Sequence, residues 1–430
     1  MPRTSITADE YRKALGHFAP RIQEKTVPGH DEDEVTLAVE AGVRALEAGQ
    51  VEPGAIGMLA VIAERPVAVA TVAAALGISE ARSKALSGAD SGAAVLAGLD
   101  HVDASGGQAL VITVGTPPTN PHDPAEHAAG TAAVAVVCGK GGLRRERATH
   151  ATAETVSLDR GDDLLSEAFD RLKVTQASHV FAAERGPGAQ GALEKRFGKS
   201  IRSGLSWFTG DLGPASALAN LAAGASRITA GESVLLITVG PQAATVLLFT
   251  AESPPATPGD FLSSLKRERR YLPFAVHQRR ATVTSGGEPS QGAYVSPTAY
   301  LAELPARYRL VGEDCAACGT LHFPPRESCT KCGSRESRPR PLKRTGEVYS
   351  YTIIGRGAAP SEFAEQQAIW GEYATAIVQL DDGPRITAML TDVPPATVKA
   401  GMRVSMVLRR LYTQEGVTRY GFKFRPWLLV

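Results

Sequence analysis

Two similar stretches decide the fold: SGAAVLAGLDHVDASGGQALVITVG at residues 91–115 and GPASALANLAAGASRITAGESVLLITVG at residues 213–240. Each is typical of a helix rich in small residues, a turn containing glycine, and a strand that ends in the identical ITVG. A second apolar strand follows each stretch, TAAVAVV at 131–137 and AATVLLF at 243–249. Chance similarity in an alanine-rich chain is the alternative. The recurrence of ITVG in the same context predicts an α/β fold of two similar halves that share one core.

The composition of the whole chain excludes several classes of protein. The 430 residues are 43% hydrophobic and 21% charged, which provides enough apolar side chain for large cores and excludes global disorder. Lys plus Arg number 46 and Asp plus Glu number 45, whereas proteins that hold nucleic acid mainly through phosphates are usually far more basic. The sequence contains no apolar run of membrane-spanning length and no apolar secretory core. We therefore expect a soluble, cytoplasmic protein without a membrane partner.

Four of the five cysteines, Cys315, Cys318, Cys329 and Cys332, form the pattern C-x2-C-x10-C-x2-C. Two such pairs allow two tight turns to direct four thiolates at one tetrahedral zinc ion. The alternative is two disulfides or free thiols, but a reducing cytoplasm and the strain of a bridge across two residues argue against disulfides. His322 lies between the pairs and is not needed as a ligand. Because all four ligands are thiolates, the pattern predicts a structural Zn2+ rather than a catalytic one.

The tail from residue 342 contains five short apolar runs separated by turn signals, such as DDGP at 381–384. This pattern predicts a small Greek-key barrel. Tyr420, Phe422 and Phe424 share one face of the run TRYGFKF. That face is either barrel core, which we favour, or a stacking platform for nucleic-acid bases.

The tail also resembles a known family. The matching segments are AELPARYRLVGEDCAACGTLHFPPRESCTKCGS at 302–334, then GEVYSYTII and YGFKFRPW. With these segments, residues 300–430 are similar to the zinc-ribbon plus OB-fold proteins that accompany thiolases and hydroxymethylglutaryl-CoA synthases. The resemblance implies a short leading helix, a rubredoxin-like ribbon and an OB barrel. It also implies a role beside acyl-CoA enzymes rather than nucleic-acid binding.

Residues 25–250 resemble the hydroxymethylglutaryl-CoA synthase branch of the thiolase superfamily. The segment KTVPGHDEDEVTLAVEAG at 25–42 is similar to that family's archaeal-type entry segment, and the duplicated halves suit the thiolase fold. The family's first strand has no expected counterpart, because residues 1–20 are typical of a polar helix.

The two resemblances together imply an α/β thiolase-like fold with two similar halves, followed by a rubredoxin-like zinc ribbon and a small OB-type β-barrel. The expected domains are a thiolase-like domain at 1–255, a connector with a basic helix at 256–299, a leading helix and zinc ribbon at 300–341, and an OB-fold domain at 342–430.

The resemblance to thiolases places three catalytic roles on residues that lack the necessary chemistry. Condensation of this type needs a cysteine nucleophile at a helix N-terminus, a histidine that carries protons, and a group that holds the oxyanion. Ala89 occupies the position of the nucleophile and Ala182 that of the histidine. The family's Gly-Asn becomes Gly210-Asp211, and an ionised Asp would repel an oxyanion. His179 lies three residues before Ala182, so we expect it on the opposite face of its strand.

Three other features complete the candidate site. Glu64, in LAVIAERP, lies where the synthase family keeps a catalytic Glu, and it is either a proton-transfer group or only a structural or solvated carboxylate. Cys138 is alone in an apolar strand-like run and is expected to be an inert core residue. The basic stretch FLSSLKRERRYL either contacts the phosphates of CoA or forms the solvated face of a helix. Its candidate phosphate ligands are Lys266, Arg267, Arg269 and Arg270.

Three functions are compatible with these residues. The favoured one is a non-catalytic accessory subunit of an acyl-CoA condensing or cleaving complex, beside a thiolase or ketosynthase-like partner, in which the OB domain helps to position CoA thioesters. The second is an acyl-CoA-processing enzyme with altered chemistry that uses Glu64 or Asp211. The third is a nucleic-acid-binding zinc-ribbon/OB module, which the near-neutral charge disfavours. An oligomer is expected, of either one chain or several.

Overall fold

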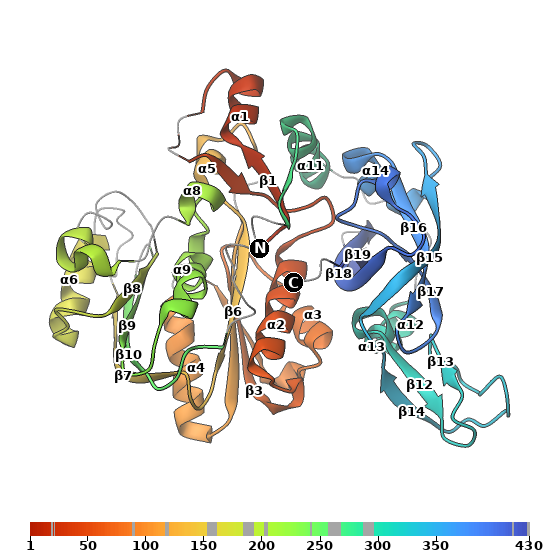
Figure 1. Cartoon of the computed structure of the whole chain (residues 1–430), viewed down its shortest axis with the longest axis horizontal. Coiled ribbons are helices and arrows are strands. Elements are labelled where there is room, and N and C mark those ends of the chain that lie inside the picture. Colours follow the sequence, from red (N-terminus) through yellow and green to blue (C-terminus); the bar gives the residue numbers. More distant parts are fainter. Residues whose placement is uncertain are drawn as a thin grey trace. The chain divides into compact units, whose positions relative to one another are not determined.

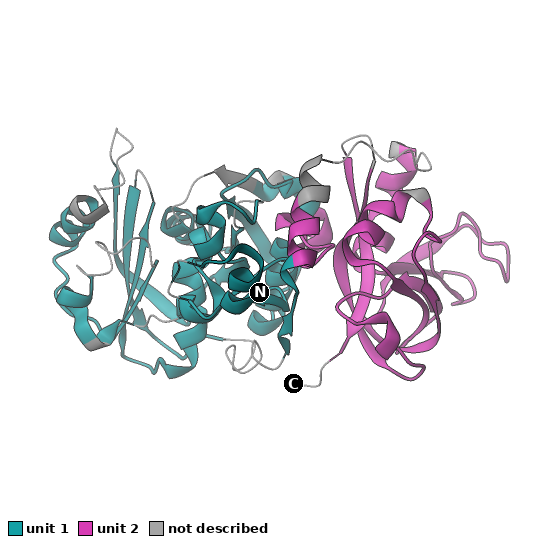
Figure 2. Cartoon of the chain, turned by 90° about the horizontal axis from the view of Figure 1, so that it is seen from above, with its two compact units in different colours: residues 1–28, 37–73, 78–274 teal, residues 29–36, 74–77, 275–430 magenta. Residues whose placement is uncertain are grey.

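The computed structural model describes residues 1–18, 20, 22–87, 91–116, 120–152, 161–183, 193–201, 205–240, 243–256, 268–286, 296–414 and 417–427. The chain divides into two compact units (Figure 2). The first comprises residues 1–28, 37–73 and 78–274, and the second comprises residues 29–36, 74–77 and 275–430. Among the described residues, no helix has both the length and the apolar character needed to cross a membrane.

Two four-stranded mixed sheets form the framework of the first unit (Figure 1). The first sheet has the order β4 (Ser83–Ser87), β3 (Ile56–Ala63), β5 (Gln108–Gly115) and β6 (Ala132–Cys138). The second has the order β7 (Leu143–Thr152), β10 (Ala243–Ala251), β9 (Ser233–Val239) and β8 (His179–Ala182). In both sheets, the strand that carries ITVG pairs antiparallel with the strand that follows it, and parallel with an earlier strand. The repeated sequence therefore forms the same supersecondary unit twice.

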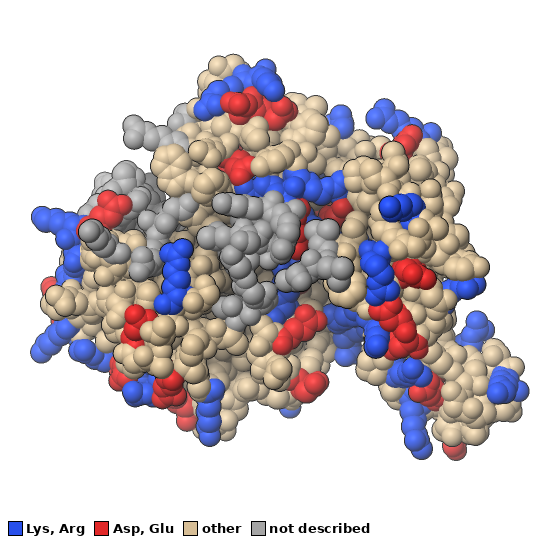
Figure 3. Space-filling model, in the orientation of Figure 1, with Lys and Arg blue, Asp and Glu red and all other residues tan. Residues whose placement is uncertain are grey.

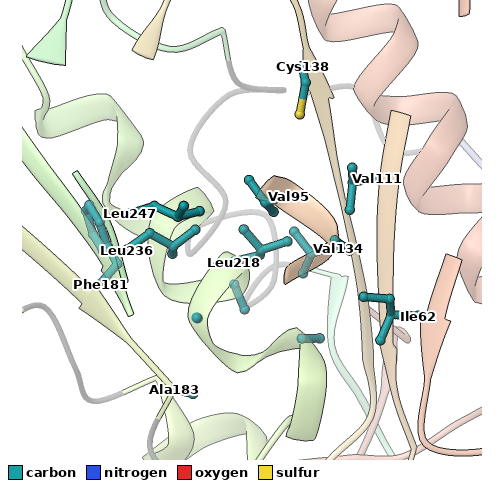
Figure 4. Packing of buried hydrophobic residues seen from close by; sticks show 14 of the residues in the cluster. Ile62, Val95, Val111, Val134, Cys138, Phe181, Ala183, Leu218, Leu236 and Leu247 are labelled. Atoms are coloured by element: carbon teal, nitrogen blue, oxygen red, sulfur yellow. The ribbon is translucent and has the colours of Figure 1, made fainter. Parts of the chain in front are cut away.

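Two central helices, α4 (Ser91–Ser105) and α9 (Ser216–Gly224), lie between the sheets (Figure 1). One hydrophobic cluster joins inner-face residues of both sheets to residues of both helices (Figure 4). Its members include Val111 and Val134 of the first sheet, Leu236 and Leu247 of the second, Val95 of α4 and Leu218 of α9. This shared cluster confirms the prediction of two similar halves around one core.

The glycines of the central helices allow this close packing. A Cβ atom at Gly92 would overlap with Thr238 Oγ1 and lie 2.7 Å from Thr245 Cβ. Gly92 also donates its backbone N–H to Thr238 Oγ1 at 3.1 Å, so the first turn of α4 is fixed directly to the second sheet. At the end of α9, a Cβ at Gly224 would lie 2.5 Å from the Phe181 ring.

Further helices cover the outer faces of the two sheets. Helix α6 (Gly161–Leu172) packs Leu165 and Phe169 against outward-facing side chains of β9 and β10. Helices α2 (Glu34–Gly49) and α3 (Val69–Leu76) lie beside β3 in Figure 1. The short elements of this unit are α8 (Ser206–Thr209), η1 (Pro53–Ala55), η2 (Glu80–Arg82), η3 (Gly198–Ser200), η4 (Gly213–Ala215) and η5 (Ala225–Arg227).

The N-terminal residues form a strand that the sequence analysis did not predict. Strand β1 (Thr4–Thr7) pairs with β2 (Glu24–Thr26) and β11 (Arg270–Tyr271) in a separate three-stranded sheet, and α1 (Ala8–Leu15) follows it. The expectation that residues 1–20 are helical throughout was therefore wrong for Thr4–Thr7, where β-branched residues and pairing with β2 favour a strand.

A buried polar cluster anchors this small sheet to the rest of the first unit. The Lys25 ammonium donates to Glu126 Oε1 at 2.5 Å, and the Tyr11 hydroxyl donates to Glu126 Oε2 at 2.7 Å. All three side chains are buried, and Glu126 belongs to α5 (Pro124–Ala128). Burial lowers the pKa of Lys25 to about 8, although the Glu126 carboxylate opposes this shift.

The second unit begins with helices and a three-stranded ribbon. The helices are α11 (Phe274–Gly286), α12 (Pro297–Ala302) and α13 (Leu304–Arg309). The ribbon has the order β13 (Leu321–His322), β12 (Val311–Cys315) and β14 (Ser337–Pro341), all antiparallel. The cysteine pairs begin at the end of β12 and in the loop between β13 and β14.

The tail forms a five-stranded, nearly closed barrel, as its apolar runs predict. Its order is β17 (Arg385–Met389), β16 (Tyr373–Leu380), β15 (Thr345–Ile354), β18 (Arg403–Gln414) and β19 (Val417–Pro426). A parallel bridge between Leu390 and Phe424 brings the two edge strands together. Phe424 is fully buried in the barrel core, as the core interpretation of that face predicts, whereas the buried Tyr420 donates its hydroxyl to Asp33 at 2.8 Å. The connections contain η6 (Ser361–Phe363), α14 (Ala364–Trp370) and η7 (Pro395–Thr397).

The close approach of α4 to the second sheet gives a testable prediction. We expect Gly92→Ala to lower the free energy of unfolding by about 1–3 kcal/mol, because the added methyl must displace buried Thr238 and Thr245 side chains. Gly54→Ala is the matched control, since a Cβ there meets no atom within 4 Å, and its effect should stay within about 0.5 kcal/mol. Chemical denaturation of the three proteins measures both values. Equal stability of the two variants would contradict this description of the core.

Candidate functional site

The four predicted zinc ligands converge in the ribbon. Their Sγ atoms all lie within 4.8 Å of one another. The Sγ atoms of Cys315 and Cys332 are 3.6 Å apart, and so are those of Cys318 and Cys329. A tetrahedral zinc ion with Zn–S bonds of about 2.3 Å holds its sulfurs about 3.8 Å apart. The side chains therefore fit a four-thiolate Zn2+ site with no vacant position for a substrate.

Each cysteine pair lies in a tight turn that a glycine closes. Gly319 donates its N–H to Cys315 O, and Gly333 donates to Cys329 O, both at 2.9 Å. These glycines have φ values of +69° and +76°, in the left-handed region that glycine adopts readily. The two C-x2-C-G segments thus form equivalent turns that present their thiolates to one point.

Polar groups around the sulfurs support their negative charge. His322 is buried, and its Nε2 lies 3.4 Å from Cys329 Sγ. The backbone N–H of Lys331 donates to the same sulfur at 3.4 Å, and Thr320 Oγ1 lies 3.1 Å from Cys318 Sγ. Four thiolates on Zn2+ carry a net charge of −2, which such neighbours stabilise. His322 was not predicted to be a zinc ligand. Its contact with Cys329 Sγ indicates that it supports the charge of that thiolate.

Ala182 and Asp211, to which the thiolase resemblance assigns catalytic positions, belong to the first unit. Ala89 falls outside the described residues. Ala182 ends β8 and is buried, and its carbonyl accepts a hydrogen bond of 3.0 Å from Asn220 Nδ2. His179 lies 3.0 Å from Glu232 Oε2 and stacks on Phe181, which faces the central cluster, whereas Ala182 faces the outer cluster. The expected separation of His179 and Ala182 on opposite faces is therefore observed.

Asp211 has a structural role in this fold. Its Oδ1 accepts hydrogen bonds from the Gly213 N–H at 2.9 Å and from Ser216 Oγ at 3.1 Å, at the entry to α9. Its backbone is also fixed, because Asp211 N–H donates to Ala128 O at 2.8 Å and Gly130 N–H donates to Asp211 O at 2.7 Å. A carboxylate that accepts a hydrogen bond from the backbone N–H two residues further along forms an Asx turn, so Asp211 stabilises the turn that leads into α9.

Glu64 directly follows β3 and is exposed to solvent. Next to it, Arg65 donates to Thr116 Oγ1 at 3.0 Å, which links the ends of β3 and β5. The first unit contains a cavity of about 450 Å³, but its lining comes from β6, α2 and neighbouring segments. Glu64, Ala182 and Asp211 are not among the residues that line it.

The structure describes Cys138 and part of the basic stretch. Cys138 is buried in the central cluster, and burial raises the pKa of its thiol to about 12, which keeps it protonated. Lys266 and Arg267 lie outside the described residues. Arg269 forms an ion pair with Glu24 and donates to Phe208 O at 3.0 Å, and Arg270 lies in β11. Phosphate contact by this stretch stays a prediction.

Sequence reasoning missed one group of functional interest. Asp31 and Glu32, in the segment GHDEDE at 29–34, contact buried cations of the barrel. A run of acids before a helix was visible in the sequence, but its partners lie almost four hundred residues away. Only the fold brings the two together.

The metal site gives a second prediction. Elemental analysis of the purified chain should find one zinc per chain, and Cys318→Ser should lose it because three sulfurs leave the tetrahedral site incomplete. Cys138→Ala removes the cysteine outside the cluster and should keep the full zinc content. Full zinc in Cys318→Ser, or none in the unmodified chain, would contradict the assignment.

Known proteins are similar to both the C-terminal part and the thiolase-like part of the chain. The ChsH2 rubredoxin-like zinc ribbon domain matches residues 302–338, and the ChsH2 C-terminal OB-fold domain matches residues 339–409. A DUF35 domain-containing scaffold protein of Methanocaldococcus jannaschii is 40% identical over 123 residues, which cover 28% of this chain and 83% of that protein.

The remaining similarities concern acyl-CoA enzymes. A hydroxymethylglutaryl-CoA synthase of Pyrobaculum calidifontis is 33% identical over 162 residues, covering 34% of this chain and 46% of that enzyme. A solved HMG-CoA synthase complexed with CoA superposes with a TM-score of 0.58 at 17% identity, covering 68% of this chain and 92% of that one. The likeness confirms the predicted thiolase-like fold. The chain therefore belongs to the family of DUF35 domain-containing scaffold proteins, and it carries a thiolase-like domain in the same polypeptide.

Proposed function

We propose that this chain is a non-catalytic accessory subunit of an acyl-CoA condensing or cleaving complex. In this proposal, the thiolase-like domain docks with an active thiolase or ketosynthase-like protein. The zinc ribbon stabilises the barrel, and the barrel helps to position CoA thioesters. The single observation that carries the proposal is the state of Asp211, whose carboxylate is engaged in the turn before α9 at the position where condensation needs an oxyanion holder.

The other catalytic positions support the same conclusion. Ala182 presents only a methyl group where a histidine would carry protons. The nearest described histidine along β8, His179, is on the other face of the strand and contacts Glu232. Cys138 is a protonated thiol inside the core, so it is not a substitute nucleophile.

Its relatives supply the acyl-CoA context of the proposal. The Methanocaldococcus jannaschii relative is named a scaffold protein, and a scaffold needs no reactive side chain. The first unit shares its fold with an HMG-CoA synthase complexed with CoA, which makes a CoA thioester the ligand class we propose. The domain boundaries 1–255, 256–299, 300–341 and 342–430 remain part of this proposal.

Neither alternative function has an observation in its favour. An enzyme with altered chemistry would use Glu64 or Asp211, but the first is exposed and the second accepts hydrogen bonds in the turn before α9. A nucleic-acid-binding barrel would need exposed aromatic residues on β19, where Tyr420 and Phe424 are buried. On the face drawn in Figure 3, positive and negative side chains are interspersed among the described residues.

A reconstitution assay tests the proposal. The purified chain alone should show no turnover of acetoacetyl-CoA with CoA, whereas a thiolase that co-purifies with it should be active and should be more active with this chain present. The Cys318→Ser chain is the control, because loss of the metal should disorder the ribbon and remove the enhancement. Turnover by the chain alone, at a rate that the thiolase does not increase, would overturn the proposal.

A further inference from the structure

The acidic segment Gly29–Thr36 belongs to the second compact unit, although Pro28 before it and Leu37 after it belong to the first (Figure 2). It carries Asp31, Glu32 and Asp33 in succession. Asp31 and Glu32 are almost completely buried, with 0% and 2% of their surface exposed. Buried carboxylates need partners, and in this unit the barrel provides them.

Asp31 contacts two cations of the barrel. Its Oδ2 accepts a hydrogen bond of 2.8 Å from the Lys423 ammonium, and its Oδ1 forms an ion pair of 3.5 Å with Arg409 Nε. Its backbone carbonyl accepts from the Arg410 N–H at 3.0 Å. The segment is therefore held through both its side chain and its main chain to β18 and β19.

The two neighbouring acids extend this contact. Glu32 Oε1 lies 2.9 Å from the Arg409 guanidinium, while its Oε2 accepts from the Gly29 N–H at 2.8 Å. Asp33 Oδ2 accepts from the Tyr420 hydroxyl at 2.8 Å. Each of the three acids thus has its own donor on the barrel strands.

Three cations of the barrel are buried at this site. Arg409 is fully buried, Lys423 has 1% of its surface exposed and Arg425 has 7%. Asp392 of the barrel lies 3.0 Å from Arg409 and 3.7 Å from Arg425. Asp31 and Glu32 add two buried carboxylates to this group. Buried cations without such partners are strongly destabilising.

A ring contact and a second arginine complete the fit. The His30 ring stacks on Trp370 of α14, with centroids 4.9 Å apart and an angle of 20° between the planes. Arg280 of α11 donates to Gly29 O and to Glu32 O, both at 3.1 Å. The segment therefore occupies a site shaped for its side chains and its backbone.

We propose that Asp31, Glu32 and Asp33 form a docking plug, and that the barrel surface of Arg409, Arg410, Tyr420 and Lys423 is its receptor. The receptor fits an acidic segment that immediately precedes a helix, and this chain fills it in cis. In this proposal, the plug of the same chain fills the receptor, and the barrel does not exchange it for the acidic segment of another molecule. This inference concerns association only, so it does not depend on the proposed function.

Cleavage of the full chain tests the plug. A protease site placed between Gly286 and Ser296 leaves the plug and Arg280 in one fragment and the receptor in the other. After cleavage, size-exclusion chromatography should show both fragments eluting together. In the double variant Asp31→Asn/Glu32→Gln, association should be weaker by at least about 100-fold, so the fragments should separate at micromolar concentration.

Two further variants keep this test decisive. Asp381→Asn removes an exposed pair with Arg403 in the same barrel and should leave co-elution unchanged. Tyr420→Phe deletes only the hydroxyl that reaches Asp33, so it should fold even if the double variant does not, and it should weaken association by about tenfold. Separation of the unmodified fragments after cleavage would overturn the proposal. Tyr420→Phe and the double variant both associating as tightly as Asp381→Asn would also overturn it.

Discussion

The close approach of the two central helices to the sheets on either side is the constraint on which the first unit depends. Gly92 and Gly224 provide that approach, because neither position has room for a side chain. The contacts that hold the helices are apolar and come from both halves of the repeat. None of them needs a nucleophile, a proton carrier or an oxyanion holder. The fold therefore does not depend on such groups, and the Asp211 carboxylate contacts Ser216 at the start of the helix that follows it.

The second unit is stabilised in a different way. Its barrel is small, and its core is supplemented by a metal site at one end and a buried charge network at the β18–β19 strands. Small domains often need such additional constraints, because they bury too little apolar surface on their own. The network differs from an ordinary surface ion pair because Arg409 and Asp31 are fully buried, so that removal of either one leaves its buried partners with one counter-charge fewer.

The sequence predicted the architecture well, because periodic patterns and cysteine spacing are local signals. The repeated ITVG located β5 and β9, the C-x2-C pairs located the metal site, and the alternating runs located the barrel strands. The strand at Thr4–Thr7 was missed because its pairing with β2 and β11 depends on residues far along the chain. The roles of Asp31, Arg409 and Lys423 were missed for the same reason. The turn formed by Asp211 could not be inferred either, since only the loop geometry shows what its carboxylate contacts.

The central claim is that the thiolase-like domain keeps its fold without acyl-transfer chemistry. Intact-protein mass spectrometry tests this most directly, on the zinc-loaded chain incubated by itself with an excess of acyl-CoA. The account predicts an unchanged mass and no adduct that neutral hydroxylamine releases, because Ala89, at the position where the thiolase resemblance implies a nucleophile, carries only a methyl group. A stoichiometric, hydroxylamine-labile acyl adduct on any residue of the chain would contradict it.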